Sequence, residues 1–241
     1  MSIILLPYVR FYGKVIHVHC SERVNMAIES LKNEKFLGFD MEWKPSFSTL
    51  DPYNPVSLLQ VSGKNVVALF YLQKLGGMPK QLYQLLCDDS VLKIGCGMSE
   101  DFIRLHREFD INVNKQSWVD ISELSSACDG LPPMGLRKIC QVYLNMDLDK
   151  TMCTSDWSNN FLSPSQVLYA ATDAWVVRHI FWSAWLKPTF MCCRFDWLLA
   201  LDPTLSLNII KIANQIGWRH VIPTFQHFVS QHPHWRHCTF V

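Results

Sequence analysis

The sequence predicts an α/β protein in which helices flank a mixed β-sheet, followed by an irregular C-terminal tail. Three observations predict this class. Of the 241 residues, 49% are hydrophobic and 18% charged, which is enough apolar material for one domain and an appendage. Strand-like and helix-like periodicities alternate along the first two thirds of the chain. A strong helix-start signal, Ser163-Pro164-Ser165-Gln166, opens the last helix before residue 188.

The N-terminal elements follow from the spacing of apolar residues. The opening residues 1–13 are rich in apolar side chains and predict an edge strand, and residues 13–19 alternate in the manner of a second strand. Ser21 is expected to cap a helix whose apolar positions recur at i, i+3, i+4 and i+7. These positions are Val24, Ala27, Ile28 and Leu31. The apolar residues 36–43 predict the next strand.

The middle of the chain predicts a hairpin and then an alternation of helices and strands. Residues 56–62 and 66–72, joined across Gly63-Lys64-Asn65, predict a β-hairpin whose strands lie antiparallel beside the strand at 36–43. A helix at 80–87 and a strand at 91–95 follow the rhythm of parallel pairing, which makes the sheet mixed. Ser99 is expected to cap a helix over residues 100–109. Further helices are expected around residues 122–127, 135–143 and 164–186.

Charge and cysteine content exclude several classes of protein. The net charge is +1, from 22 basic and 21 acidic residues, so a phosphate must be bound by local cations or by a metal ion. Nine cysteines at scattered spacings predict neither a disulfide framework nor a structural zinc site, and they favour a reducing compartment. The chain contains no apolar run long enough for a membrane span and no convincing signal peptide. We expect an intracellular protein, nuclear or cytoplasmic, with the mitochondrion left open.

Two acids of the strand at 36–43 share one face. Asp40 and Glu42 are two residues apart, and side chains alternate along a strand, so both carboxylates point to the same side. Within the apolar run FLGFDMEW, two like charges this close are unfavourable unless a cation lies between them. Carboxylates are ligands for Mg²⁺ and Mn²⁺, so a metal site is one interpretation. The solvated face of an edge strand is the structural alternative.

Three further residues extend the pattern. Tyr169 and Asp173 are four residues apart and therefore share one face of the last helix, where a local hydrogen bond would also explain them. Asp101 lies in the first turn of the helix at 100–109, where its charge complements the helix dipole. Each of these signals alone has an ordinary structural explanation.

The order of these acids carries more information than any one of them. FDMEW on a strand, the aspartate of GCGMSEDFIRL and YAATD on a late helix follow the order of the three motifs of DEDD-family 3′-5′ exonucleases. The sequence resembles the branch of that family whose fifth residue is tyrosine (DEDDy). Within the branch it resembles the Werner-syndrome-type and exonuclease 3′-5′ domain-containing proteins. The resemblance extends over about residues 14–186, through PVSLLQV, GCGMSEDFIRLHREFDI and SDWSNNFLSPSQVLYAATDAW.

This resemblance implies a ribonuclease-H-like fold and a metal-dependent enzyme that hydrolyses DNA or RNA from the 3′ end and releases nucleoside monophosphates. It implies two divalent ions, Mg²⁺ or Mn²⁺, which serve the attacking water and the leaving 3′-oxygen. Asp40 is expected to bridge the ions, Glu42 and Asp173 to complete the first site, and Asp101 to hold the second. Tyr169, too weak an acid to be an efficient base, is expected to orient the attacking water.

Substrate-binding residues are expected beside the motifs. Lys44 and Arg104 are candidate phosphate ligands, and Leu59 or Phe102 is a candidate apolar wedge against the terminal base. Met41 is a further candidate, although it alternates with the two acids and so also fits a place in the core. Further cationic candidates, each of which also fits a solvated surface, are Arg107, Arg137, Lys138 and Lys150.

The domain organisation follows from the extent of the resemblance. We expect an exonuclease domain over residues 1–187 and a C-terminal tail over residues 188–241, whose histidines and cysteines lack standard zinc-finger spacing. One alternative function is a catalytically weak nucleic-acid-binding or protein-interaction module on the same fold. Another is a protein-interaction or zinc-binding subunit whose function depends on the tail.

Overall fold

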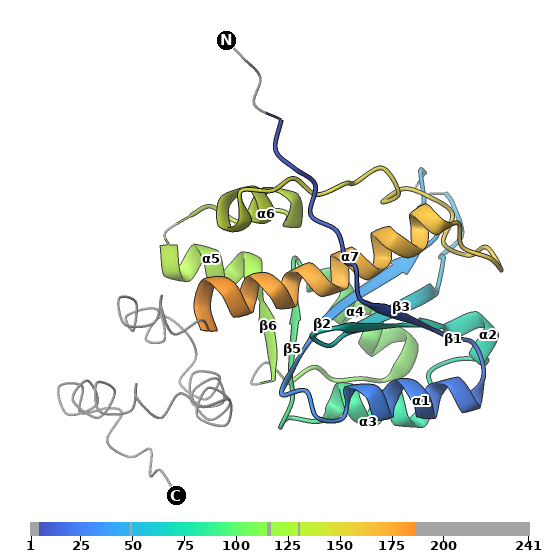
Figure 1. Ribbon diagram of the computed structural model, residues 1–241. Coiled ribbons are helices and arrows are strands. Elements are labelled where there is room, and N and C mark those ends of the chain that lie inside the picture. Colours follow the sequence, from blue (N-terminus) through green and yellow to red (C-terminus); the bar gives the residue numbers. More distant parts are fainter. Residues whose placement is uncertain (1–4, 49, 115–116, 130, 187–241) are drawn as a thin grey trace, which may run out of the picture.

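Six strands form one mixed sheet in the order β1-β4-β3-β2-β5-β6 (Figure 1). The computed structural model describes residues 5–48, 50–114, 117–129 and 131–186. The strands are β1 (Lys14–Val18), β2 (Phe36–Trp43), β3 (Val56–Ser62), β4 (Val66–Tyr71), β5 (Leu92–Gly95) and β6 (Trp118–Asp120). The strands β2, β3 and β4 are antiparallel neighbours, whereas β1 runs parallel to β4, and β5 runs parallel to both β2 and β6. The predicted hairpin and the predicted mixed sheet are both confirmed.

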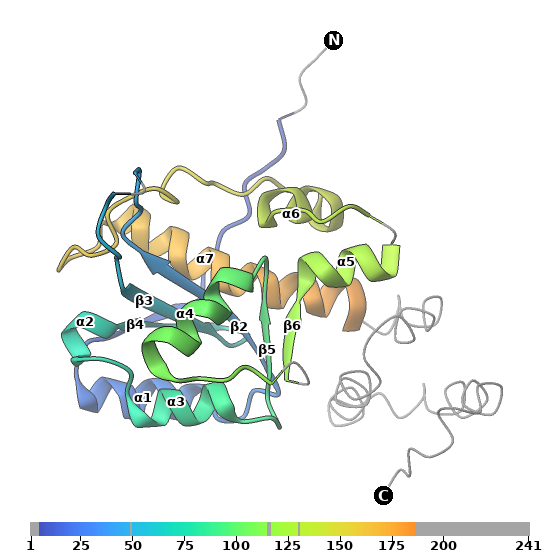
Figure 2. The ribbon, with the colours of Figure 1, turned by 180° about the vertical axis from the view of Figure 1, so that it is seen from behind.

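Helices cover both faces of this sheet (Figures 1 and 2). On one face lie α1 (Ser21–Leu31), α3 (Lys80–Cys87) and α4 (Ser99–Phe109), and on the other lie α5 (Ile121–Asp129), α6 (Leu136–Leu144) and α7 (Pro164–Ile180). The short α2 (Leu72–Leu75) follows β4, and a π-helical stretch, η1 (Phe181–Leu186), continues α7. No helix of the described residues is both long and apolar enough to span a bilayer.

The central strand β2 divides its side chains between the two helical layers. Phe39 and Met41 are buried in a cluster with residues of α1, α3 and α4. Asp40 and Glu42 alternate with them and so face α7. The strand therefore contributes apolar contacts to one layer and carboxylates to the other.

The helix α7 lies directly on β2. A side chain at Gly38 would place its Cβ 1.8 Å from the carbonyl oxygen of Ala174, so only glycine permits this approach. Arg178, one turn further along, donates to the Phe36 carbonyl at 3.3 Å and to Glu34 Oε2 at 2.7 Å. The capping box predicted at Ser163 and Gln166 begins the helix, as both of its reciprocal hydrogen bonds are present. Contacts at the start, in the middle and near the end of α7 therefore fix its position over β2.

Several local expectations differ from the structure. The described part of the opening segment crosses α7 and forms no strand, only an isolated bridge between Tyr8 and Asp147 (Figure 1). Pro7 has no amide hydrogen for a ladder. Ser21 and Ser99 lie inside their helices, because Cys20 and Met98 occupy the N-cap positions and neither makes a side-chain cap. The last α-helix ends at Ile180, and its predicted continuation to Leu186 is π-helical.

Candidate active site

Three carboxylates meet between β2 and α7. Asp40 and Glu42 come from the strand and Asp173 from the helix, and one carboxylate oxygen of each lies within 4.8 Å of the other two. Asp173 is only 2% exposed. Its Oδ1 is buried and has no hydrogen-bond partner among the described atoms. Because a buried acceptor is normally satisfied, this oxygen and its neighbours fit the ligand set of a divalent cation.

The three acids repel one another. Burial, followed by the charges of Asp173 and Asp101, raises the pKa of Asp40 well above its ordinary value. Burial and the charges of Asp40 and Asp173 do the same to the pKa of Glu42. Burial also raises the pKa of Asp173. Negative charge is therefore unfavourable here unless a cation accompanies it.

Lys150 supplies such a cation from the loop between α6 and α7. Its Nζ donates to Asp173 Oδ2 at 2.6 Å and to the Tyr169 hydroxyl at 3.1 Å. Burial alone would lower the pKa of Lys150, but the charge and hydrogen bond of Asp173 outweigh burial and raise that pKa. The ammonium group therefore partly neutralises the carboxylate cluster.

The fourth acid, Asp101, approaches from the first turn of α4 and lies outside the group of three. It is 8% exposed. Burial, with the charges of Glu100 and Asp120, raises the pKa of Asp101 to about 7. Asp120 also accepts hydrogen bonds from the backbone amides of Gly97 and Met98 and so holds the turn that leads into α4. Asp101 is placed to add charge to the cluster without joining the same triad of oxygens.

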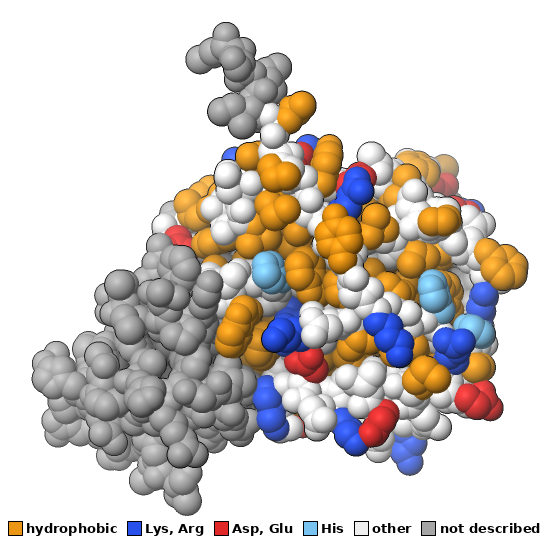
Figure 3. Space-filling view, viewed as in Figure 1, with side chains coloured by type: hydrophobic (Ala, Val, Ile, Leu, Met, Phe, Trp, Pro, Cys, Tyr) orange, Lys and Arg blue, Asp and Glu red, His pale blue; other side chains and the backbone are white. Residues whose placement is uncertain are grey.

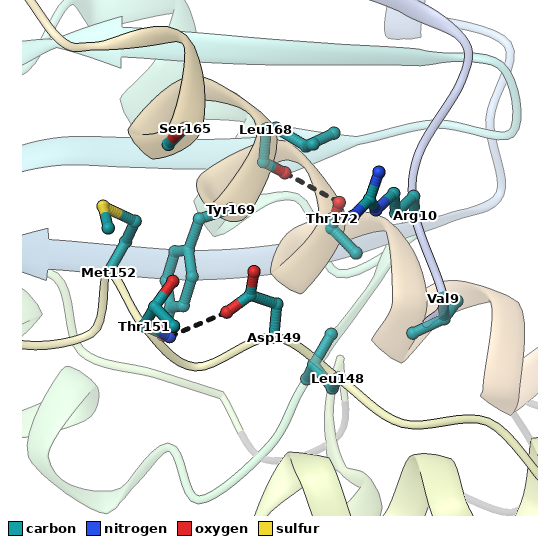
Figure 4. A pocket seen from close by; sticks show the side chains of 10 residues that line it. All are labelled: Val9, Arg10, Leu148, Asp149, Thr151, Met152, Ser165, Leu168, Tyr169 and Thr172. Carbon is teal, nitrogen blue, oxygen red and sulfur yellow. Dashed lines mark hydrogen bonds between the residues drawn. The ribbon is translucent and has the colours of Figure 1, made fainter. Parts of the chain in front are cut away.

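Tyr169 lies one helical turn before Asp173 and packs against Trp157, with the ring centroids 5.7 Å apart. Burial and the charge of Asp173 raise the pKa of its hydroxyl far above the ordinary range, so the phenol is protonated at neutral pH. Figure 4 shows the ring in the wall of a cavity of about 270 Å³, which is also lined by residues of the opening segment and of the loop at 148–152. A protonated tyrosine beside carboxylates can donate a hydrogen bond but cannot accept a proton.

The match to a known family is consistent with this site. The family described as 3′-5′ exonuclease matches residues 15–187, which include the strand, helix and loop that form the cluster. The chain belongs to the 3′-5′ exonuclease family.

Curated relatives have the words 3′-5′ exonuclease in their names. Exonuclease 3′-5′ domain-containing protein 2 of Drosophila melanogaster is 37% identical over 154 residues, which cover 61% of this chain and 25% of that protein. The bifunctional 3′-5′ exonuclease/ATP-dependent helicase WRN of Mus musculus is 29% identical over 181 residues, which cover 70% of this chain and 12% of that protein. The chain therefore spans a quarter or less of the length of these relatives.

Solved structures show the same fold. RNase D of Escherichia coli superposes with a TM-score of 0.66 at 21% identity, over 81% of this chain and 49% of that chain. The Nibbler EXO domain of Aedes aegypti gives a TM-score of 0.65 at 20% identity, over 86% of this chain and 98% of that chain. The ribonuclease-H-like fold expected from the sequence is confirmed.

Two of the expected substrate-binding residues lie in the core. Leu59 is fully buried and Met41 is 3% exposed, both in the cluster formed with α1, α3 and α4. Neither side chain has the surface to contact a nucleotide, because core packing occupies it. Both residues therefore belong to the core and not to the substrate surface.

The other three candidates have different surroundings. Lys44 is exposed and pairs with Asp156 at 3.4 Å, and Phe102 is half-buried with its ring edge-on to Trp118. Arg104 is buried between α4 and the loop after β2, where it stacks on Trp43 and donates to the Asn54 carbonyl. Arg104 thus has a structural role, while Lys44 and Phe102 remain accessible to a substrate.

The sequence makes Lys150 a candidate substrate-binding cation or a solvated surface charge, and it does not indicate the contacts with Tyr169 and Asp173. Its contact with Tyr169 and Asp173 spans 19 and 23 residues of sequence, and no helical or strand period relates positions so far apart. The pairing depends on how the loop after α6 folds over α7, which local periodicity does not encode.

Proposed function

We propose that this chain is a metal-dependent 3′-5′ exonuclease of the tyrosine DEDD branch, which hydrolyses the terminal phosphodiester of DNA or RNA and releases nucleoside monophosphates. The observation that carries the proposal is the convergence of Asp40, Glu42 and Asp173, with the buried Asp173 Oδ1 left unpartnered beside Tyr169. A purely structural cluster of acids would satisfy that oxygen with a protein donor.

Each residue has a definite role in this mechanism. Asp40, Glu42 and Asp173 would hold one divalent cation, and Asp101, approaching from α4, would contribute to a second. When bound, Mg²⁺ or Mn²⁺ lowers the pKa of the attacking water and stabilises charge on the leaving 3′-oxygen. Tyr169, protonated at neutral pH, donates a hydrogen bond that orients the attacking oxygen. Lys150 balances the charge of Asp173 until a cation competes with it.

The test uses short DNA and RNA strands labelled at the 5′ end, with Mg²⁺, with Mn²⁺ and with EDTA. We expect a ladder of products shortened from the 3′ end with either metal and none with EDTA. The Asp40→Asn variant is the matched control because it keeps the size of the side chain and removes its charge. Binding of the strands without hydrolysis under every condition would instead support the catalytically weak nucleic-acid-binding module.

We also propose that residues 1–187 suffice for this activity. The proposed ligands and the sheet that carries them all precede residue 187, and the family match ends there. The predicted tail at 188–241 lies outside the described residues. A chain ending at residue 187 should unfold cooperatively and keep its hydrolytic rate within a few fold. An insoluble or inactive product would show that the tail belongs to the catalytic unit.

A further inference from the structure

A second hollow lies at the β1–α2 end of the sheet, outside the carboxylate cluster. It is an open groove of about 360 Å³. Figure 3 shows histidine, basic and hydrophobic side chains gathered at this end of the molecule. The groove is lined by His17, His19, Tyr71, Lys74, Asn160, Phe161 and Leu162.

Aromatic rings and a cation alternate across the groove. Lys74 Nζ lies 5.2 Å from the centroid of Tyr71 and 4.6 Å from that of Phe161. Phe161 is 87% exposed, so most of its ring is free to stack on a ligand. Within the described part of the chain Lys74 has no carboxylate within salt-bridge distance. Exposed rings beside unpaired cations are the combination with which proteins hold single-stranded nucleic acid.

The charge around the groove is positive. Burial lowers the pKa of His17, and the positive charges of His19, Arg23 and Lys74 lower it further. None of the residues that line the groove carries a carboxylate. An anion would therefore be attracted here, whereas the carboxylate cluster needs a metal ion before it can approach a phosphate.

The register of the sheet relates the groove to the carboxylates. Glu42 pairs with Leu58 across β2 and β3, and Leu58 pairs with Tyr71 across β3 and β4. Cross-strand partners point to the same face, so Glu42 and Tyr71 share a face two strand spacings apart, or about 10 Å. This separation corresponds to about three nucleotides at the 3.4 Å rise of a stacked strand.

One segment of the chain connects the carboxylate cluster with the groove. Trp157 packs on the ring of Tyr169, and Phe161, four residues later, lines the groove. A strand whose 3′ end lies at the carboxylates would cross this segment to reach the groove.

We propose that this groove is a subsite for a single-stranded substrate, holding a nucleotide about three positions before the 3′ end. Its base stacks on Phe161 and its phosphate pairs with Lys74. The inference rests on the proposed exonuclease function. It explains how a chain of net charge +1 holds a polyanion, since the contact needs only a few cations in the right place.

The test compares a dinucleotide, which is too short to reach the groove, with a strand of ten nucleotides. Phe161→Ala should raise KM for the ten-nucleotide strand by about five- to a hundredfold and leave kcat/KM for the dinucleotide unchanged. Lys74→Ala should lower the slope of log Kd against log salt for the ten-nucleotide strand by about 0.7. That Kd is measured by fluorescence anisotropy in EDTA, so binding is read without hydrolysis.

Matched controls lie elsewhere on the surface. Tyr12→Ala removes another aromatic ring that is 87% exposed, at the opposite end of β1, and Lys80→Ala removes an exposed cation at the first residue of α3, on the other face of the sheet. Both controls should have the same KM, kcat/KM and salt dependence of Kd as the unaltered protein. The subsite would be refuted if Phe161→Ala and Lys74→Ala also behaved in this way, or if they impaired both lengths equally.

These outcomes separate the two proposals. An unaltered protein that hydrolyses both lengths, with variants that bind the ten-nucleotide strand normally, refutes the subsite alone and leaves the groove to a protein partner. An unaltered protein that hydrolyses neither length refutes the exonuclease function. In that case normal binding of the ten-nucleotide strand by Phe161→Ala would refute the subsite as well.

Discussion

The two faces of β2 carry opposite kinds of side chain. On one face Phe39 and Met41 are 2% and 3% exposed and pack among apolar side chains. On the other, Asp40 and Glu42 meet Asp173 in a cluster whose charges repel. Adjacent residues of one strand therefore have opposite effects on stability: the apolar side chains stabilise the fold and the carboxylates destabilise it. The apolar face stabilises the fold, and this allows the acidic face to keep the unfavourable arrangement that the proposed metal site requires.

The largest expected effect comes from the acidic face. Asp40→Asn should lower kcat by at least about a thousandfold, because the proposed mechanism uses this residue as a metal ligand. The unfolding midpoint in EDTA should stay the same or rise, since one repelling charge is removed. Single-turnover hydrolysis and thermal unfolding measure the two effects. Asp173→Asn should abolish hydrolysis without raising the midpoint, because Lys150 then loses its partner.

The neighbouring residue provides the contrast. Phe39→Ala should lower the free energy of unfolding by about 3–5 kcal/mol, through lost burial and the cavity left behind. The fraction that stays folded should hydrolyse at a rate within a few fold of the unaltered protein. Denaturant titration gives the stability, and the rate is measured well below the unfolding midpoint. If Asp40→Asn and Phe39→Ala each reduced both the hydrolysis rate and the stability, the two faces of β2 would not have separate roles.

The next effect tests whether Tyr169 positions the water or transfers a proton. Tyr169→Phe should lower kcat by about ten- to a thousandfold, the loss of one hydrogen bond in the transition state. Because burial and the charge of Asp173 keep the pKa of the phenol high, this loss should be constant between pH 6 and pH 9. The pH-rate profiles of both proteins measure it. A loss that grows with pH would mean that the phenolate acts as a base.

A smaller effect concerns Lys150 as the internal cation of the acidic face. Lys150→Met should lower the free energy of unfolding in EDTA by about 1–3 kcal/mol, less than for a fully buried pair because the lysine side chain is 30% exposed. Saturating Mn²⁺ should remove most of this difference, since a bound cation replaces the missing charge. Thermal unfolding with and without Mn²⁺ provides the measurement. An equal loss in both conditions would limit Lys150 to a packing role.

The smallest effect is the pH dependence of stability, to which a buried acid and a buried base contribute with opposite sign. The pKa of Asp101 is raised to about 7, so this residue stabilises the metal-free fold at low pH, and that contribution is lost as pH rises through 7. Burial lowers the pKa of Lys93, in β5, to about 8, so stability should increase as pH rises from about 8 towards the ordinary lysine value.

Two variants isolate these contributions. Asp101→Asn should flatten the loss of stability between pH 4 and pH 7 in EDTA, and Lys93→Met should flatten the gain above pH 8. Denaturant midpoints measured across this pH range provide the readout. Unchanged profiles would show that other groups control the pH dependence.

The predictable parts of the site are pairs of residues that lie within one strand or one helix, where the repeat of that element decides which side chains share a face. Asp40 and Glu42 share a face because strands repeat every two residues, and Tyr169 and Asp173 share one because helices repeat about every four. The hairpin and the Ser163 cap followed from equally local signals. These signals sufficed for the fold class and for most of the proposed ligands.

The parts that were missed depend on contacts between distant segments. Lys150 reaches Asp173 because its loop folds over α7, and Arg104 is buried because the loop after β2 closes on α4. The opening segment binds to Asp147 and Thr172 instead of extending the sheet. Serine is favoured at an N-cap, yet Met98 is the N-cap of α4, and Asp120 from β6 binds the amides of Gly97 and Met98 just before the helix.

The contact of Gly38 with Ala174 has a consequence for how sequence variation in this protein would be interpreted. A methyl group at position 38 would push α7 away from β2, and Asp173 and Tyr169 would move with the helix. In a library of random variants, position 38 would therefore lose activity with every substitution, although it touches neither metal nor substrate. Intolerance at a site of this kind reports the spacing between two backbones, and it would be mistaken for a catalytic signature if the protein were known only from its mutational profile.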